Sequence, residues 1–512
     1  MTTSIPPETE PLLLDTQGEE NQPLFPRQEP ERRWKANPYW VIPIVLVVNI
    51  ARGMTLSPRI NVFTDIACRA VEAANLVAQD CEAPAVAARA SKVQASVLTI
   101  MNVLSSASTG LWSQYGDVKG RKIVFCVSIC GFVAMEFIFL LVSKTSFTAR
   151  EDVFILIGPV LEGFAGGLSV FNGVVHAYVS DCSPDGSRSR IFSLLQGGVF
   201  CGLAIGPWIA GVLLSYTSLG VYSMFSISII LQLVLLAYII LVLPESLRKK
   251  ESLELRSPHD TTLVQVPSPN KGIRSYLRRF MVALISPITI FRPRKVEVGT
   301  TSKFDYNVTL MGLAMFLYIT STAVYPLKYL YGRRTFTWDP KQLGYYMSLL
   351  WICRATNLFF VLPVIVRYFK PKTPITGAST PDEIASELNF DKRLAQGSLV
   401  VDALADMFVA VSSSELAFVA FSCLSAFTSG GNPALHSLGA VCLHALGYSE
   451  ETGRLFGAIG VLNAISHSIS PGLFAFTYSS TVETHPKTIF VLASGMLCTS
   501  VFLLSFIRAR GW

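Results

Sequence analysis

Long apolar stretches recur along the chain, and each is long enough to cross a lipid bilayer as one helix. About 20 apolar residues span the hydrocarbon core, and twelve such stretches occur. The ninth contains two aspartates and the eleventh is rich in Gly and Ser, so these two are the least typical. The pattern predicts an all-α membrane protein. The expected helices cover residues 38–58, 93–115, 123–143, 153–180, 191–217, 221–243, 306–330, 343–366, 396–413, 416–443, 453–478 and 488–507.

The composition agrees with a chain that lies largely in lipid. Only 15% of the residues are charged and 51% are hydrophobic, whereas about 25% are charged in an average soluble protein. The net charge is +7, but no basic patch is interleaved with aromatic residues. We therefore expect no nucleic-acid partner. The N-terminus stays polar up to Arg32 and Arg33, so we expect the first apolar stretch to be retained as a helix.

Lys and Arg residues are concentrated in alternate connections between the apolar stretches. Cytoplasmic loops carry this excess, and the basic set includes both ends of the chain and the long middle loop. We therefore expect both termini and the middle loop in the cytoplasm. The predicted organisation is a disordered tail (1–37), a six-helix bundle (38–245), a cytoplasmic central loop (246–303), a second six-helix bundle (304–507) and a short cytoplasmic tail (508–512).

Two segments outside the apolar stretches leave alternatives open. Residues 273–291 alternate basic and apolar side chains, which fits either an amphipathic helix on the inner leaflet or a solvated linker helix. Glu8-Thr-Glu-Pro-Leu12-Leu13 looks like an acidic dileucine sorting signal, although a disordered tail is the simpler explanation. The expected location is the plasma membrane, with a vacuolar or lysosomal membrane as the alternative.

The ten cysteines do not form a metal or redox motif. Eight lie in or beside apolar stretches, where Cys behaves as a small hydrophobic residue. Cys68 and Cys81 share a polar loop and become disulfide candidates if that loop is extracytoplasmic. We expect no metal and no cofactor.

The connection between the second and third stretches places charges around a tight turn. Gly120 gives the turn backbone freedom. Asp117, Arg121 and Lys122 can form ion pairs with each other or with neighbouring helix ends. Breaking such pairs would release one conformation in favour of another, so these residues are candidates for a conformational switch.

Glycines recur every four residues in the fifth stretch, at Gly198, Gly202 and Gly206, followed by Pro207 and Gly211. On a helix this spacing places the glycines on one face, so a neighbouring helix can approach closely. Proline removes one backbone donor and bends a helix. We therefore expect a packing face and a hinge here.

These motifs resemble the major facilitator superfamily, whose turn signature is a glycine, three residues and Asp-Arg-x-Gly-Arg-Arg/Lys. The chain departs from it at Ser113 and Val118, where a glycine and a basic residue are expected. The resemblance implies two six-helix bundles related by a pseudo-two-fold axis, which carry a small molecule across the bilayer by alternating access as a monomer. The matching residues are Asp117, Gly120, Arg121 and Lys122.

The direction of transport follows from a second point of resemblance. Within that family, fifth-helix glycines ending in Gly-Pro-x-x-x-Gly are associated with proton-driven exporters. The first half, over residues 158–172 and 187–195, more faintly resembles tetracycline exporters and the folate- and haem-type proton-coupled carriers. The folate-type carriers import and typically lack the Gly-Pro pair. The alternative is therefore a proton-coupled importer of an anionic nutrient, such as a folate-like compound or an organic acid.

Ionisable side chains inside the expected helices are costly and therefore candidates for function. Glu162 is the preferred proton carrier, because a carboxyl removed from water can exchange protons near neutral pH. Arg52 and Arg354 could hold a substrate anion or neutralise a carboxylate, and each candidate could instead be a structural ion pair. Asp402 and Asp406 lie one turn apart, which suits a second acidic site or a helix–helix ion pair. The candidates are Arg52, Glu136, Glu162, Lys328, Arg354, Asp402 and Asp406.

Other classes of function lack their sequence features. No Gly-x-x-x-x-Gly-Lys-Ser/Thr run is present, so an ion gradient must drive transport. No arrangement of nucleophile, base and oxyanion donors indicates an enzyme, and the short C-terminal tail argues against a signalling receptor. We expect a proton-coupled exporter of a drug, toxin or secondary metabolite, with protons and the lipid bilayer as its other partners.

Overall fold

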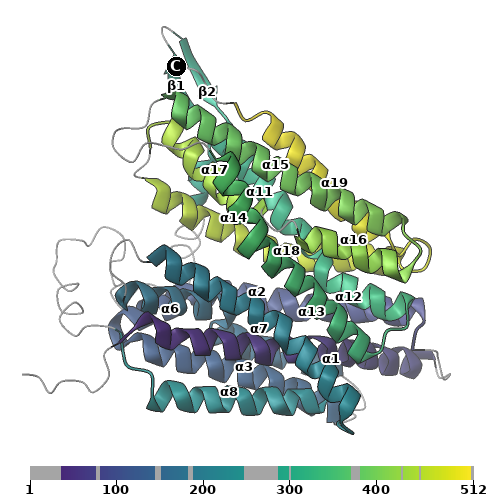
Figure 1. Cartoon of the computed structure of the whole chain (residues 1–512). Coiled ribbons are helices and arrows are strands. Elements are labelled where there is room, and N and C mark those ends of the chain that lie inside the picture. The colour runs from purple at the N-terminus through teal and green to yellow at the C-terminus, as the bar shows by residue number, and fades with distance from the viewer. Residues whose placement is uncertain are drawn as a thin grey trace, which may run out of the picture. The chain divides into compact units, whose positions relative to one another are not determined.

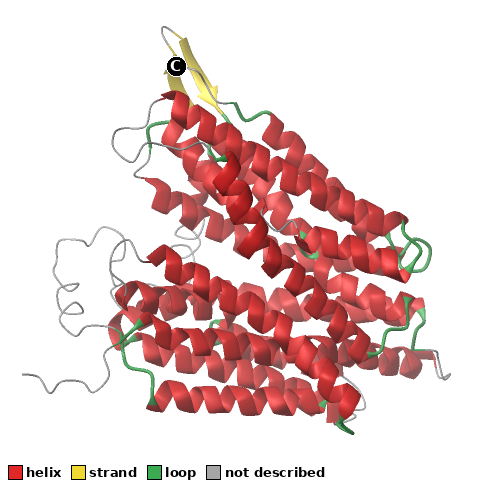
Figure 2. Ribbon diagram, in the orientation of Figure 1, coloured by secondary structure: helices red, strands yellow, loops and turns green. Residues whose placement is uncertain are grey.

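The computed structural model describes residues 36–75, 81–144, 151–182, 188–246, 286–298, 301–370, 381–427, 431–448 and 451–508. Helices make up nearly all of this structure (Figures 1 and 2). We call the described residues 36–246 the N-half and the described residues 286–508 the C-half. The dileucine-like segment and residues 273–285 of the expected amphipathic helix lie outside the described residues.

The N-half is a bundle in which α1 packs along α7 and α8, and α3 packs along α8 (Figure 1). The fourth apolar stretch consists of three short helices, α4, α5 and α6. The bounds are η1 (Pro38–Trp40), α1 (Val41–Asn75), α2 (Pro84–Lys119), α3 (Arg121–Lys144), α4 (Glu151–Phe154), α5 (Ile157–Phe164), α6 (Gly167–Cys182), α7 (Arg188–Tyr216) and α8 (Ser223–Leu241).

The C-half packs α15 against α16, α17 and α19, and α11 against α18 and α19. It opens with a 3-10 turn and an antiparallel hairpin that the sequence did not reveal, in which Arg294 pairs with Asp305. The bounds are η2 (Ser286–Phe291), β1 (Arg294–Val298), β2 (Thr301–Asp305), α11 (Asn307–Ser321), α12 (Val324–Thr335), α13 (Pro340–Thr356), the π-helical turn η3 (Asn357–Val361), α14 (Leu362–Phe369), α15 (Pro381–Val411), α16 (Glu415–Phe427), α17 (Gly431–Ala445), α18 (Thr452–Thr481) and α19 (Thr488–Ser505).

Ten segments of the described chain are long and apolar enough to cross a membrane. The expected ninth and eleventh stretches are among them, within Asp382–Val411 and Arg454–Thr481. The second and tenth are not. The tenth is divided into α16 and α17, whereas the second is one helix of 36 residues with many small polar side chains.

Polar side chains of α2 donate hydrogen bonds to the backbone at a helix break between α5 and α6. Gly166 and Gly167 adopt positive φ angles of 99° and 52° and separate α5 from α6. A helix break in lipid leaves carbonyl groups that need donors from another element. Three α2 side chains supply them: Ser105 Oγ donates to Gly166 O (2.6 Å), Ser108 Oγ to Gly163 O (2.8 Å) and Trp112 Nε1 to Phe164 O (2.8 Å).

Buried apolar side chains form shared and separate clusters in the two halves. One cluster combines residues of both halves, such as Phe63 and Phe139 with Tyr346 and Phe418, and it includes Cys68 near the end of α1. Two further large clusters are each confined to one half, one of them holding Phe291 of η2. The halves therefore share a core at the Cys68 end of α1.

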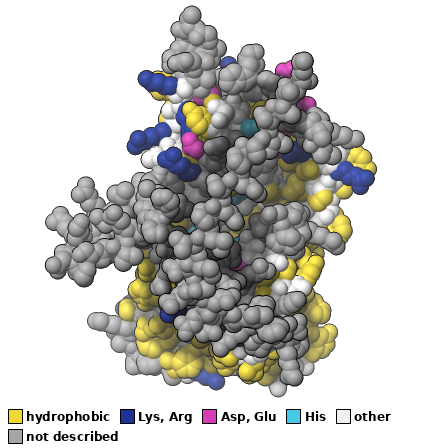
Figure 3. Space-filling model, turned by 90° about the vertical axis from the view of Figure 1, so that its left-hand side faces the viewer, with side chains coloured by type: hydrophobic (Ala, Val, Ile, Leu, Met, Phe, Trp, Pro, Cys, Tyr) yellow, Lys and Arg dark blue, Asp and Glu magenta, His cyan; other side chains and the backbone are white. Residues whose placement is uncertain are grey.

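Large apolar side chains are also exposed on the outside of the helices. Leu111, Leu241 and Phe476 expose 70%, 81% and 71% of their surface. Figure 3 shows hydrophobic side chains gathered on the lower part of one face. Exposed apolar surface on this scale fits contact with lipid, so the chain is an integral multi-pass membrane protein.

Candidate functional site

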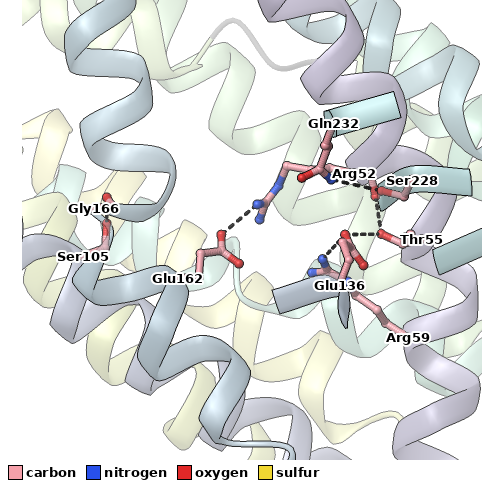
Figure 4. A network of polar contacts seen from close by, with 9 residues as sticks. All are labelled: Arg52, Thr55, Arg59, Ser105, Glu136, Glu162, Gly166, Ser228 and Gln232. Carbon is pink, nitrogen blue, oxygen red and sulfur yellow. Dashed lines mark hydrogen bonds and ion pairs between the residues drawn. The ribbon is translucent and has the colours of Figure 1, made fainter. Parts of the chain in front are cut away.

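Buried charges in the N-half meet along one face of α1. The Arg52 Nη1 atom lies 2.7 Å from Glu162 Oε1, and the Arg52 guanidinium also stacks over the ring of Phe132 at 4.7 Å. The Glu162 side chain is fully buried. Glu162 lies in α5 just before the break that α2 stabilises, so the break fixes where its carboxylate meets α1 (Figure 4).

A second ion pair lies two helical turns further along α1. Arg59 Nη2 is 2.6 Å from Glu136 Oε1, and Thr55 Oγ1 donates to the same oxygen at 2.9 Å (Figure 4). Arg59 stacks over Phe139 at 5.1 Å. The sequence placed Arg59 outside the first helix because that helix was expected to end at residue 58, whereas α1 continues to Asn75. The spacing of seven residues from Arg52, which puts both arginines on one helical face, is the signal that could have identified it.

Each of these two glutamates has one oxygen without a partner. Glu136 Oε2 and Glu162 Oε2 are buried and accept no hydrogen bond from any residue that the structure describes. Buried acceptors are normally satisfied, so these oxygens need an explanation. A carboxyl group held by one arginine and bare on its other oxygen can take up a proton there without breaking another bond.

The C-half contains one direct pair of buried charges. Lys328 Nζ of α12 lies 2.6 Å from Asp406 Oδ1 of α15, with side chains that are 0% and 4% exposed. Lys328 also lies 5.2 Å from the ring centroid of Tyr325. Asp402 is buried one turn before Asp406. The pair joins α12 to α15 inside the bundle.

Arg354 occupies an aromatic site near the C-terminal end of α13. Its guanidinium carbon lies 4.8 Å from the ring centroid of Tyr325 and 5.1 Å from that of Trp351. A cavity of about 170 Å³ adjoins these three side chains. The π-helical turn η3 follows directly, and such turns are frequent at functional sites. The role of Trp351 was not anticipated from the sequence.

The switch residues of the turn after α2 are brought together at the ends of three helices. Arg121 forms ion pairs with Asp117 and, at 3.1 Å, with Asp181 of α6. Gly120 has a φ of 110°, and a Cβ atom there would collide with the carboxylate of Glu245. Lys122 Nζ donates to Ile240 O at 2.7 Å. Glu245, which the sequence analysis missed, accepts from the backbone N–H groups of Arg121 (2.8 Å) and Lys122 (3.2 Å).

The glycine face of α7 lies between two other helices. A Cβ atom on Gly206 would come within 2.5 Å of Ile50 O and 2.8 Å of Gly53 Cα on α1. On the α13 side, a Cβ on Gly344 would lie 2.9 Å from Pro207 O. Gly202 is packed as closely on α1, Gly211 meets Tyr345 of α13, and Gly198 has only an ordinary contact. Helix α7 continues as one helix through Pro207.

The ten cysteines form one disulfide and otherwise stay free, in line with their surroundings in the sequence. Cys68 and Cys81 are joined by a disulfide that links the end of α1 to the start of α2. The other eight are free thiols. Among the described residues, no group of three His, Cys, Asp or Glu side chains is placed to hold a metal ion.

Comparison with known proteins places this geometry in a family. The sequence matches the Major Facilitator Superfamily over residues 83–471. It is 24% identical to the MFS-type transporter avaJ of Aspergillus versicolor over 508 residues, covering 97% of this chain and 94% of that protein. It is 27% identical to the class H tetracycline resistance protein of Pasteurella multocida over 205 residues, covering 39% of this chain and 46% of that protein.

The crystal structure of the human organic anion transporter MFSD10 (TETRAN) has the same fold, with a TM-score of 0.58 at 16% identity over 93% of this chain and all of that one. Family and fold are those of transporters of small molecules, and the chain belongs to the Major Facilitator Superfamily.

Proposed function

We propose that this transporter exports a small organic molecule in exchange for protons, with Glu162 as the proton carrier. The observation that carries the proposal is the Arg52–Glu162 pair, whose Glu162 side chain is fully buried and keeps an Oε2 atom without a partner among the described residues. A proton on Glu162 cancels the charge that holds Arg52. The pair therefore has two states that differ in how firmly α1 is held to α5.

Helix α1 is well placed to pass this change to the rest of the molecule. It packs along α7 of its own half and also contacts α13 of the C-half. Ser57 of α1 donates to Pro340 O at 2.7 Å, across the two halves. A shift of α1 relative to α5 therefore strains a contact between the halves. Alternating access needs such a link between ion binding and rocking of the halves.

The arrangement of apolar clusters supports a state closed at the Cys68 end. There the halves share one core, whereas the other two large clusters each belong to a single half. We propose that the shared core separates when the opposite end closes. With both termini in the cytoplasm, the disulfide would lie outside it and the described state would face the cytoplasm.

Export is favoured over import by the fifth-helix glycine motif and by the relatives. The similarity to a tetracycline resistance protein supports a drug or a related secondary metabolite as cargo. The unpaired cation at Arg354 and the fold shared with an organic anion transporter favour a second candidate, the proton-coupled import of an anionic nutrient. The chain would act as a monomer in the plasma membrane or in a vacuolar or lysosomal membrane.

Proteoliposomes separate these two directions and test the proton site. The purified full chain is reconstituted with a pH-sensitive dye inside, and proton movement is followed after addition of tetracycline or benzoate. Proton flow opposite to the cargo supports export, and flow in the same direction contradicts it. We expect Glu162→Gln to retain downhill exchange but to lose gradient-driven accumulation at least tenfold. Glu483→Gln, at an exposed glutamate, is the matched control. Gradient-driven accumulation that survives Glu162→Gln would exclude Glu162 as the carrier.

A further inference from the structure

Arg354 of α13 is a half-buried cation that has no counter-ion among the residues that the structure describes. Arg52, Arg59 and Lys328 each lie within 2.7 Å of a carboxylate oxygen. The side chain of Arg354 forms no ion pair and no hydrogen bond with any residue that the structure describes, and its guanidinium lies over two aromatic rings. Asp402 attracts it electrostatically without a direct bond. An unpaired charge inside a membrane helix is costly, so a function is needed to account for it.

The contacts of Arg354 leave its hydrogen-bonding edge available. The guanidinium carbon lies over the rings of Tyr325 and Trp351, 4.8 and 5.1 Å from their centroids, and no described residue accepts a hydrogen bond from the guanidinium. The N–H donors of a guanidinium lie in its plane, as a fork that matches the two oxygens of a carboxylate. The rings therefore hold the fork in place while no protein acceptor uses it.

A second donor at the same place is also unused. The indole Nε1 of Trp351 is buried and donates to no acceptor among the described residues. A buried donor without an acceptor is costly, because it has lost its hydrogen bonds to water. Two unused donors on neighbouring side chains favour an anion over a cation or a neutral hydrocarbon as the missing partner.

The cavity beside Arg354 limits the size and shape of that partner. Its volume is about 170 Å³, and it is lined by Thr322, Tyr325, Tyr329, Leu350 and Trp351. Sites for drug-sized ligands begin near roughly 300 Å³. This cavity suits a small anion, or the anionic end of a larger molecule, with a flat apolar ring against the aromatic walls.

We propose that Arg354, Tyr325 and Trp351 bind the carboxylate group of an aromatic acid, as the substrate site of the transport function proposed above. The site also touches the other half, because Trp351 stacks on Phe200 of α7 with ring centroids 6.1 Å apart. A ligand that fixes Trp351 therefore acts on a contact between α13 and α7, the helix pair that carries Gly344 and Pro207.

Binding to the purified full chain tests this site without any gradient. Radiolabelled benzoate is titrated onto the protein in detergent, with neutral benzamide, which has nearly the same shape, and acetate, which lacks the ring, as competitors. We expect benzoate to compete at least tenfold better than benzamide, because the charged hydrogen bonds depend on the anion. Acetate should compete more weakly than benzoate because it leaves the aromatic walls empty.

Three variants locate the binding. Arg354→Gln should weaken benzoate binding at least tenfold and remove the preference over benzamide. Trp351→Phe keeps a ring but loses the indole donor, and it should weaken benzoate binding at least threefold. Arg367→Gln, at an exposed arginine on α14, should bind like the wild type. If Arg354→Gln fails to fold, Arg354→Lys replaces it, since it keeps the charge but loses the fork, and it too should bind more weakly.

Specific results would overturn the proposal. Equal competition by benzoate and benzamide would exclude an anion site. Benzoate affinity that is unchanged in the Arg354 and Trp351 variants would place the site elsewhere, and failure of benzoate and benzenesulfonate to bind at millimolar concentration would remove it. The outcome is independent of proton coupling, because the competition between benzoate and benzamide is measured in detergent without any gradient. Loss of coupling and loss of the anion site are therefore distinguishable.

Discussion

The N-half and the C-half bury the same kinds of charge in different arrangements. Each half buries cations and carboxylates within its membrane helices. In the N-half they form two direct pairs, Arg52–Glu162 and Arg59–Glu136, both with the cation on α1. In the C-half Lys328 and Asp406 pair directly, whereas the Arg354 side chain forms no ion pair with any described residue.

The two halves therefore differ in the geometry of their buried charges. Paired charges with bare carboxylate oxygens, as in the N-half, can change state by gaining one proton. Arg354, which lies over two rings, is already charged, so it can bind an anion but does not need to gain a proton. We therefore assign proton coupling to the N-half and ligand binding to the C-half as complementary proposals.

The largest expected effect comes from breaking the buried pair of the C-half. Lys328→Met leaves the Asp406 carboxylate buried without its partner, which should lower the free energy of unfolding by about 3–5 kcal/mol. Arg354→Met removes a cation that has no ion pair, so it should cost much less. Thermal unfolding of both variants in the same detergent measures the contrast.

The double variant Lys328→Met/Asp406→Leu checks the cause of that loss. Replacing both charges by apolar groups should recover most of the stability, because no unpaired charge is left. If Lys328→Met is as stable as Arg354→Met, the distinction between paired and unpaired cations in the C-half is wrong.

A smaller effect is expected from the glycines of the two halves. Gly206→Ala forces a Cβ atom against Ile50 O and Gly53 of α1 and should cost about 1–3 kcal/mol in unfolding free energy. Gly460→Ala on α18 meets nothing within 4 Å and should be neutral or stabilising by up to about 1 kcal/mol. Unfolding midpoints of the two variants provide the comparison, with Gly198→Ala, whose new Cβ lies 3.7 Å from Val45, as a control inside α7. Equal losses at Gly206 and Gly198 would refute the close approach of α1 and α7.

The smallest effect concerns the hairpin at the start of the C-half. Arg294 Nη2 lies 2.7 Å from Glu451 Oε2, and this bond lowers the pKa of Glu451 below its usual value. A lowered folded pKa means that the pair stabilises docking above the unfolded pKa of about 4.3. That contribution disappears as the pH falls through the lower folded value. It should amount to less than about 1 kcal/mol because the pair is partly exposed.

Hydrogen exchange of residues 294–305 between pH 6 and pH 3 measures this docking. The exchange protection should fall at low pH in the wild type and should be low throughout in Glu451→Gln. Protection that depends on pH equally in both proteins would show that Glu451 does not hold the hairpin.

The apolar stretches and the turn motif were sufficient to predict an all-α transporter fold, because lipid demands long helices with satisfied backbone groups. The sequence alone did not identify α2 as an unusually polar membrane helix. This helix is polar because Ser105, Ser108 and Trp112 supply donors to the break before Gly167. The sequence also ended the first helix before Arg59. Both errors have one origin. The partner of a polar residue in a membrane helix lies in the neighbouring helix, and the sequence of the helix itself does not show it.

By itself, the sequence determined which residues must lie in the membrane and which charges would be costly there, since hydropathy and chemical type are local properties. The tertiary structure decided which of those charges meet. It placed Arg52 on Glu162, Lys328 on Asp406, and Arg354 over two rings with no counter-ion among the described residues. Ion pairing depends on distances of a few ångströms between side chains far apart in the chain, and only the packing of the helices determines those distances.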